Sequence, residues 1–525
     1  MIIPRAKKEA QSELKFSLQM PLTVNTDADS EFAVEIISEM APYLDPVHSE
    51  AFDSAVSIEI RPQISLKNEF YSISIKDNKI KIIAKDKRGV VNAIASLTQL
   101  VSEKNDKYYI NETEIEDYPD KEFRSFMIDT GRKYIPLDDL RSQILSMAKA
   151  KMTKLHWHIT DSQGCPVHLN TLPDMRSPDP AGRKYTKDEM RSIVDYAAKF
   201  MIDVIPEIDM PGHSFELVEY MPNLRCQAEH TEGWVICIGN EDSYKYIEDI
   251  FSELTEIFPY EYYHVGTDEI DMRDIKAKRG WQKLDWQNCS VCNEKFGKLG
   301  LTTVTERFYY FVKRVYNILG KLGKKMVMWN DNIDISQSPD LPRDILIEFW
   351  RVAGENRGPR EGCSMKRFLD EGFTVINADY PNTYVDLYVE WNKLRSWNLT
   401  ADPAEAGDAS GLVIGAEACA WEVLRHYAFS LYTTIPAFAD RAYNLSPITN
   451  ESEFGTALTR IALGASVTTG FNMFDNILCD FILGYNDCNI FKADANLKKF
   501  KNTLTSLTAI SKDQSKLISA YLELL

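Results

Sequence analysis

The sequence has few cysteines, an excess of acidic over basic residues and no long apolar run. Nine cysteines among 525 residues are scattered and odd in number, which disfavours a disulfide framework and favours a reducing compartment. With 60 basic against 78 acidic residues, the formal charge of −18 repels phosphate backbones and anionic lipid, so nucleic-acid and membrane partners are not expected. The sequence contains no run of about 18 apolar residues, the length that could span a bilayer.

The beginning of the chain as given has no secretory apolar segment, because its first apolar run is only three residues long. We therefore expect a cytoplasmic protein, with a processed secreted form as the alternative. Its oligomeric state does not follow from the sequence.

One pair of cysteines has the spacing of metal ligands. Cys289 and Cys292 form a Cys-x-x-Cys motif, and Cys226 and Cys237 could complete a four-thiolate zinc site. A single Cys-x-x-Cys motif is a weak signal. We therefore expect ordinary free thiols, no metal and no cofactor, and the zinc site remains the alternative.

The first 118 residues have the pattern of a small, non-catalytic α+β domain. In EFYSISIKDNKIKIIAKD (69–86), two runs with alternating apolar residues flank Asp77 and Asn78, which predicts two strands joined by a tight turn. RGVVNAIASLTQLVSE (88–103) follows with the period of a helix. Strands with a covering helix indicate a separate domain over residues 1–118.

From Arg124 onward, apolar strand-like runs alternate with helical periods. The runs are RSFMIDTG, KLHWHITDS, MIDVIPEID, YYHVGTDE, KMVMWNDN, ILIEFWRV, FTVINADY and GLVIGAEACAW. Eight such units favour a closed (β/α)₈ (TIM) barrel over an open sheet. We place the barrel at residues 119–475 and expect residues 476–525 to form a helical extension that packs on it.

Polar and aromatic residues stand at the carboxyl ends of nearly all these strands, which meet at one mouth of a barrel. They are Asp129, Arg132, Asp161, Glu207, Asp209, Asp268, Glu269, Trp329, Asp331, Trp350, Asp379, Glu417 and Trp421. Carboxylates beside aromatic rings, without a phosphate-binding glycine loop, are typical of a sugar site. Glycosidic cleavage needs a proton donor and negative charge near the anomeric carbon, which adjacent acids such as Asp268 and Glu269 can supply.

Taken alone, an Asp-Glu pair more often caps a helix in solvent. The matching chemistry of the other strand ends favours a catalytic role for Asp268 and Glu269.

Seven motifs in order resemble the β-N-acetylhexosaminidases of glycoside hydrolase family 20, between about Phe123 and Asn444. The motifs are DTGRKYIPL (129–137), KLHWHITDSQG (154–164), VIPEIDMPGHS (204–214), HVGTDE (264–269), MWND (328–331), TYVD (383–386) and GAEACAW (415–421). The N-terminal segment is also similar to the small domain that precedes this barrel in the family.

The resemblance implies a retaining, substrate-assisted mechanism in which the sugar's own 2-acetamido group attacks the anomeric carbon and forms an oxazolinium ion. It assigns Glu269 as general acid and base, Asp268 to the acetamido N–H, and Tyr384 to the acetamido oxygen. The substrate would be an oligosaccharide or glycan that ends in a β-linked GlcNAc, with GalNAc as an alternative.

The same resemblance implies the residues that hold the sugar. Arg132 would bind the O3 and O4 hydroxyls, and Asp386 would bind O4 or O6. Asp161 and His213 would support the acid. Three tryptophans would wall the sugar and its acetamido methyl: Trp329, Trp350 and Trp421. Trp157 and His158, by contrast, are interpreted as barrel packing.

One departure from the family concerns the end of the eighth strand. The family reads Trp, any residue, Glu, whereas this chain has Trp421, Glu422 and Val423. Recognition at C4 of the sugar is therefore open. Two alternatives follow: a biosidase of the same mechanism that releases a disaccharide, and a sugar-binding barrel without catalysis.

Overall fold

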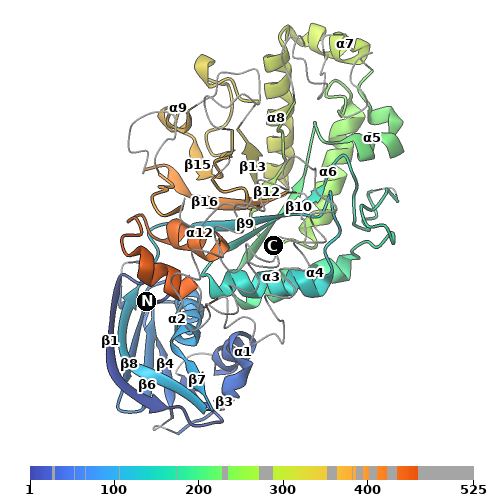
Figure 1. The fold of residues 1–525 in the computed structure, drawn as a ribbon. Helices are drawn as coiled ribbons and strands as arrows, with labels where there is room; N and C mark the ends of the chain where they lie inside the picture. Colours follow the sequence, from blue (N-terminus) through green and yellow to red (C-terminus); the bar gives the residue numbers. More distant parts are fainter. Residues whose placement is uncertain are drawn as a thin grey trace, which may run out of the picture.

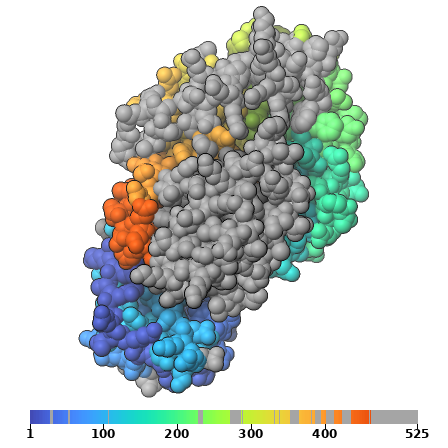
Figure 2. All heavy atoms as spheres, viewed as in Figure 1, coloured from blue at the N-terminus to red at the C-terminus, as the bar shows by residue number. Residues whose placement is uncertain are grey.

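A computed structural model describes residues 1–26, 30–51, 54–65, 67–105, 107–172, 174–227, 235–270, 286, 288–330, 332–351, 364–380, 382–385, 394–400, 411–421, 434–458 and 461. These residues form an N-terminal sheet and a closed barrel (Figure 1). In Figure 2, the N-terminal part, coloured blue, occupies one end of the molecule. The extension expected at residues 476–525 lies outside the described residues.

The N-terminal part is a mixed sheet with the strand order β1-β8-β5-β6-β4-β2-β3, and β7 pairs with β8. Its strands are β1 (Lys8–Ser17), β2 (Thr23–Thr26), β3 (Val47–His48), β4 (Val56–Ile60), β5 (Tyr71–Lys76), β6 (Lys79–Ala84), β7 (Ser102–Lys104) and β8 (Lys107–Asp117). Its helices are α1 (Ser30–Met40), the 3-10 turn η1 (Pro42–Leu44) and α2 (Lys87–Leu100). The α+β domain predicted from the sequence is confirmed.

Local sequence explains the hairpin and the helix of this domain. Asp77 and Asn78 have φ angles of 52° and 59°, which a tight hairpin turn between twisted strands requires and which Asp and Asn tolerate. Asp86 caps α2, because its side chain accepts a hydrogen bond of 2.8 Å from the Gly89 amide. A Cβ on Gly89 would lie 2.6 Å from the Phe70 carbonyl oxygen.

The barrel consists of eight parallel strands, and β9 pairs with both β10 and β16 to close it. The strands are β9 (Phe123–Asp129), β10 (Lys154–Thr160), β11 (Asp203–Ile208), β12 (Tyr262–His264), β13 (Lys325–Trp329), β14 (Leu346–Phe349), β15 (Thr374–Asn377) and β16 (Val413–Ala420). Seven of these strands fall within the predicted apolar runs, and β9 begins one residue before its run, at Phe123. The predicted (β/α)₈ barrel is therefore confirmed.

Helices surround the barrel (Figure 1). They are α3 (Leu137–Lys149), α4 (Lys187–Lys199), α5 (Phe215–Tyr220), η2 (Pro222–Leu224), α6 (Glu241–Thr255), α7 (Ser290–Leu299), α8 (Val304–Lys321), η3 (Ile335–Gln337), α9 (Met365–Asp370) and α12 (Thr434–Tyr443). Capping boxes with Thr at the N-cap and Glu three residues later begin α4 and α8. Among the described residues, no helix is long and apolar enough to cross a membrane.

The barrel interior is layered, because alternate residues of each strand point inward. An apolar layer fills the end nearer the strand starts, and its members are Phe123, Ile205, Val327, Leu346 and Ile376. Above it is a polar layer of Ser125, His156, Glu207, His264, Glu348 and Glu417, none of them more than 1% exposed. Met127, Trp329, Ala378, Tyr384 and Cys419 follow toward the mouth.

Buried ion pairs join the two domains. The Lys151 ammonium lies 2.9 Å from Asp117 Oδ2 at the end of β8, and it donates to the Tyr71 hydroxyl at 2.7 Å. Arg124 in β9 lies 2.5 Å from Glu69 Oε2. These pairs fix the N-terminal sheet against the side of the barrel away from the mouth.

Candidate active site

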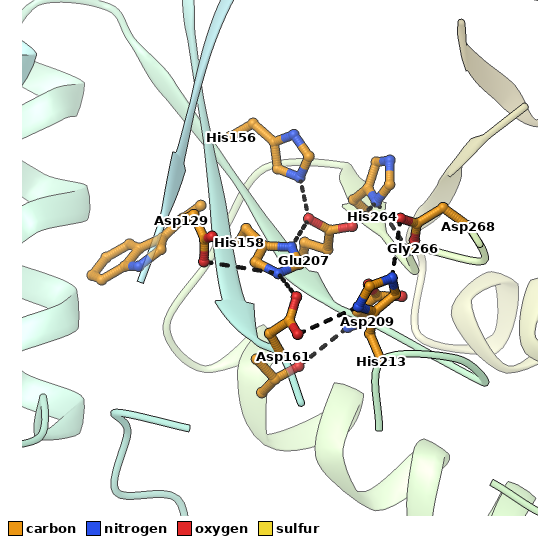
Figure 3. Close-up of polar contacts among 12 residues, drawn as sticks. Asp129, His156, His158, Asp161, Glu207, Asp209, His213, His264, Gly266 and Asp268 are labelled. Atoms are coloured by element: carbon orange, nitrogen blue, oxygen red, sulfur yellow. Dashed lines mark hydrogen bonds and ion pairs between the residues drawn. The ribbon is translucent and has the colours of Figure 1, made fainter. Parts of the chain in front are cut away.

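Glu207 is the centre of the polar layer (Figure 3). Its Oε1 atom accepts a hydrogen bond of 3.0 Å from the Trp329 indole and lies 2.8 Å from His264 Nδ1. Its Oε2 atom lies 3.1 Å from His156 Nε2 and also contacts His158 Nδ1. Burial raises the pKa of Glu207, but the three histidines outweigh it and hold that pKa well below its ordinary value. An ionised carboxylate thus orients the tryptophan beneath the mouth.

Two further carboxyl groups share the polar layer. Glu417 lies 2.9 Å from His156 Nδ1 and accepts a hydrogen bond of 2.5 Å from Ser125. Burial lowers the pKa of His156, but Glu417 and Glu207 outweigh it and raise that pKa to about 9. Burial and the charge of Glu417 raise the pKa of Glu348 well above its ordinary value. In this layer, the charged form of His156 and the neutral form of Glu348 are therefore both favoured.

Glu207 and Glu417 lie deeper than the sequence suggested. Both were placed with the groups of the mouth, but each is followed along its strand by further inward-facing positions. Asp209 continues the inward row of β11, and Cys419 and Trp421 continue that of β16. The mouth positions belong to those residues because side chains alternate along a strand.

The two adjacent acids follow β12 through an unusual turn. Gly266, Thr267 and Glu269 have φ angles of 67°, 77° and 49°, a region that side-chain-bearing residues rarely adopt. A Cβ on Gly266 would lie 1.8 Å from Asp209 Oδ1, so only glycine fits there. The turn leaves the Asp268 side chain 10% exposed, whereas the Glu269 side chain is 41% exposed. The two neighbours therefore have different environments.

His213 connects Asp161 to both acids, and Figure 3 shows its contacts with Asp161 and Asp268. Its Nδ1 atom lies 3.3 Å from Asp161 Oδ1, and its Nε2 atom lies 3.5 Å from both Asp268 Oδ2 and Glu269 Oε2. Burial lowers the pKa of His213, but Asp161 and Asp268 outweigh it and raise that pKa well above its ordinary value. Burial raises the pKa of Glu269, but the hydrogen bond and charge of His213, with two arginines, lower it overall.

The pKa values of Asp161 and Asp209, two acids of the same region, are shifted in opposite directions. Asp161 Oδ2 lies 3.1 Å from His158 Nε2 and 2.7 Å from the Arg132 guanidinium. Burial raises the pKa of Asp161, but Arg132 and His213 outweigh it and hold that pKa well below its ordinary value. For Asp209, burial and the charge of Asp268 raise the pKa well above its ordinary value. The neutral form of Asp209 is therefore favoured beside Asp268.

Arg132 is held in one orientation at the mouth. Two acids contact its guanidinium, Asp161 at 2.7 Å and Asp129 at 3.1 Å. The guanidinium carbon also lies 4.9 Å from the ring centroid of Trp421, which is the range of a cation–π contact. The planar group is thus fixed against an aromatic wall.

That wall is a row of aromatic rings. The ring centroids of Trp350 and Tyr384 are 6.3 Å apart with planes 29° from parallel, and Tyr384 lies 6.4 Å from Trp421. Trp329 lies 5.8 Å from Trp421, on the side of the barrel interior. The segment of Tyr384 is tied to β16, because the Cys419 amide donates to the Thr383 carbonyl at 2.9 Å.

Arg351 completes a closed circle of contacts. Its guanidinium lies 4.5 Å from the Trp350 ring centroid, and its Nη2 atom lies 3.5 Å from Glu269 Oε1. We call the circle the mouth ring; in order of contact, it contains Glu269, Arg351, Trp350, Tyr384, Trp421, Arg132, Asp161 and His213. One side of the ring is acidic and titratable, and the other is aromatic.

Every residue to which the family resemblance assigns a catalytic or sugar-binding role, where the structure describes it, belongs to the mouth ring or contacts one of its members. Asp268 contacts the ring through His213, and Trp329 does so through Trp421. Asp331 and Asp386 lie outside the described residues, as do Glu422 and Val423.

Sequence reasoning missed Arg351 and undervalued His158. Arg351 directly follows Trp350, and a cation beside an aromatic strand end was the available signal. His158 was interpreted as barrel packing, but it faces the interior and contacts Asp161. The alternation of His156 and His158 along β10 could have indicated that both point inward. Trp157 does pack outside, where its ring lies 5.4 Å from that of Tyr185.

Comparisons with known proteins agree with this geometry. A family model described as "Glycosyl hydrolase family 20, catalytic domain" matches residues 122–444, and one described as "Glycosyl hydrolase family 20, domain 2" matches residues 1–118. A curated relative, a beta-hexosaminidase of Porphyromonas gingivalis, is 27% identical over 336 residues, which cover 59% of this chain and 41% of that protein. The chain thus spans less than half of that relative's length.

Solved structures share the fold. A chitobiase of Flavobacterium johnsoniae superposes with a TM-score of 0.77 at 23% identity, covering 95% of this chain and 77% of that one. An exo beta-N-acetylglucosaminidase of Vibrio harveyi, solved with N-acetylglucosamine, has a TM-score of 0.76 at 21% identity and covers 90% of this chain and 78% of that one. Since the two family models together match most of its residues, this chain belongs to glycosyl hydrolase family 20.

Proposed function

We propose that this protein is an exo-acting, retaining β-N-acetylhexosaminidase that removes terminal β-linked GlcNAc from glycans, with GalNAc as an alternative sugar. The mouth ring carries the proposal, because it sets an exposed carboxylate, Glu269, opposite an aromatic wall. The names of the relatives point the same way: a beta-hexosaminidase and an exo beta-N-acetylglucosaminidase bound to N-acetylglucosamine.

In this proposal, the aromatic side of the ring holds the terminal sugar. Trp329, Trp350 and Trp421 pack against the apolar faces of the pyranose and its acetamido methyl. Arg132 is already oriented by Asp129 and Asp161, so its planar group can bind two neighbouring hydroxyls with little loss of side-chain entropy.

The acetamido group is the nucleophile. Its carbonyl oxygen attacks the anomeric carbon and forms an oxazolinium ion as the glycosidic bond breaks. Tyr384 donates a hydrogen bond to that oxygen and orients it. Asp268 accepts the N–H, and its negative charge stabilises the positive charge that develops on the acetamide. The raised pKa of the neighbouring Asp209 keeps a second negative charge away from Asp268.

Glu269 transfers the proton. In the free site its pKa is lowered, but the side chain is 41% exposed, and a bound sugar would remove water from it and favour the protonated form. After Glu269 has given its proton to the leaving oxygen, His213 stabilises the resulting carboxylate. Glu269 then acts as a base for the water that opens the oxazolinium ion and restores the retained configuration.

The test is hydrolysis of an aryl β-N-acetylglucosaminide by the wild type and by Glu269→Gln. Wild type should turn over, and the variant should lose about 10²–10⁴-fold in rate, the usual contribution of a general acid. An aryl β-glucoside, which lacks the acetamide, is the matched control and should not be cleaved. No turnover of either the GlcNAc or the GalNAc glycoside by wild type would refute the proposal.

The product released from a natural glycan distinguishes the exo-acting enzyme from a biosidase. Chromatography should find a monosaccharide. A disaccharide would show instead that the corner near Trp421 accepts a second sugar.

A further inference from the structure

Four cysteines that are far apart in the sequence meet in one buried cluster. Cys226, Cys237, Cys289 and Cys292 are each no more than 3% exposed, and their sulfurs all lie within 4.8 Å of one another. Cys237 Sγ lies 3.9 Å from Cys289 Sγ and 3.7 Å from Cys292 Sγ. Among the described residues, this is the one group of four potential ligand atoms that lie so close together.

The four sulfurs come from two segments of the chain. Cys226 and Cys237 flank an antiparallel bridge between Arg225 and Ile236, where the Cys237 amide donates to the Leu224 carbonyl at 2.7 Å. Cys289 is the N-cap of α7, and its sulfur accepts a hydrogen bond of 3.5 Å from the Cys292 amide.

The two segments approach each other closely at a glycine. Gly239 lies two residues after Cys237, and a Cβ there would lie 2.6 Å from the Cα of Cys292. A larger residue would push α7 away and separate the sulfurs. Gly239, which is not itself a potential ligand, therefore permits the close approach.

We propose that these four cysteines form a structural Zn²⁺ site. In a tetrahedral site with Zn–S bonds of about 2.3 Å, neighbouring sulfurs are about 3.8 Å apart, which matches the 3.7 and 3.9 Å contacts. A disulfide instead requires about 2.05 Å between sulfurs, and the Cys237 sulfur lies much farther than that from the sulfurs of Cys289 and Cys292. A Cys-x-x-Cys pair joined by a second pair is a common ligand pattern of structural zinc.

Binding of Zn²⁺ would displace the thiol protons of the four cysteines. Four thiols release four protons to solvent, and four thiolates bind one Zn²⁺, which leaves a net charge of −2 on the site. The Cys292 amide that points at Cys289 Sγ and the amino end of α7, a helix of ten residues, both favour negative charge at this place.

The site would connect the two loops that carry the catalytic groups. Cys226 and Cys237 lie on the segment after β11, which also carries Asp209 and His213. Cys289 and Cys292 lie on the segment after β12, downstream of Glu269. Figure 1 shows α5 and α7, which adjoin these segments, at the same end of the molecule. The metal would restrain both loops at some distance from the reacting atoms.

Metal analysis of the full-length wild type, purified under reducing conditions without chelators or a metal-affinity step, is the first test. About one zinc per chain is expected. Replacement by Co²⁺ should give the absorption bands of tetrahedral thiolate coordination, and X-ray absorption should find four sulfur neighbours at about 2.3 Å. These measurements use the wild type, so they do not depend on the folding of a variant.

Two variants assign the ligands. Cys292→Ser should lose most of the bound zinc and lower the thermal midpoint, whereas Cys165→Ser, at a buried cysteine outside the cluster, should keep one zinc per chain. Wild-type protein without zinc that takes up none when Zn²⁺ is added would overturn the proposal. So would iron in place of zinc, or disulfides among the four cysteines in non-reducing mass spectrometry.

Discussion

Two neighbouring layers of the barrel interior are filled in opposite ways. The apolar layer, which includes Ile205 and Val327, forms a hydrophobic cluster. The polar layer directly above it is equally buried but carries three glutamates and two histidines in mutual contact. Both layers are built from the same strands. In β11, Ile205 and Glu207 are two residues apart and both face inward.

The difference between the two layers indicates the role of the polar layer. Buried charges contribute little net stability, and apolar side chains of similar volume often stabilise as well or better. The lower layer follows that rule. The upper layer departs from it where Glu207 contacts Trp329 and His158, and His158 in turn contacts Asp161 of the mouth ring. The polar layer thus orients the mouth.

Among the variants proposed here, replacement of Glu207, the central acid of the polar layer, should have the largest effect. Glu207→Gln removes a buried counter-charge that His156 and His158 share, so we expect a loss of about 3–5 kcal/mol in the free energy of unfolding. Ile205→Val, on the same strand in the apolar layer, should cost only about 0.5–1.5 kcal/mol. Chemical denaturation followed by tryptophan fluorescence measures both.

The activity of the same two variants sharpens the contrast. Glu207→Gln should also lower kcat, because Trp329 loses its acceptor, whereas Ile205→Val should leave kcat unchanged. Equal losses of stability in the two variants would contradict the distinction between the layers.

Asp268→Asn tests the acidic side of the mouth ring. The variant cannot stabilise positive charge on the acetamide, so we expect kcat on an aryl β-N-acetylglucosaminide to fall about 10²–10³-fold, as when one electrostatic contact to a transition state is removed. Steady-state kinetics measure it. A near-normal rate would show that the roles of Asp268 and Glu269 have been misread.

A smaller effect is expected for His156, which joins two glutamates of the polar layer. Its pKa is raised from 6.5 to about 9, so its stabilising contribution is fully present below pH 6.5 and disappears as the pH rises through about 9. Thermal midpoints of wild type and His156→Gln, measured from pH 6 to about 10, should therefore converge at the alkaline end. Parallel curves would refute the assignment.

The smallest effect is expected for His213→Asn, and it concerns the pH dependence of kcat/KM. Removing the positive charge beside Glu269 should raise the pKa of that acid, so the alkaline limb of kcat/KM, which reports the free enzyme, should move to higher pH. His168→Asn, at an exposed histidine, is the control and should leave the limb in place. An unmoved limb in the His213 variant would mean that Glu269 is not the group that sets it.

Sequence patterns predicted the elements and most of the site residues. Alternation and apolar runs report local burial, so all the barrel strands could be located, as could the turn at Asp77 and Asn78. The order of polar strand ends identified the mouth, because the carboxyl ends of barrel strands must converge. The depth of Glu207 and Glu417 was misjudged, since the number of inward positions after each acid depends on where its strand ends.

By itself, the sequence determined which residues are apolar, which acids are adjacent, and where helices and turns begin. These properties depend on neighbours a few residues apart. Only the tertiary structure decided that Arg351 contacts Glu269 and that Cys226 and Cys237 meet Cys289 and Cys292. Such contacts join residues more than 50 positions apart, and they depend on how the barrel closes and on the paths of its loops, which no local pattern encodes.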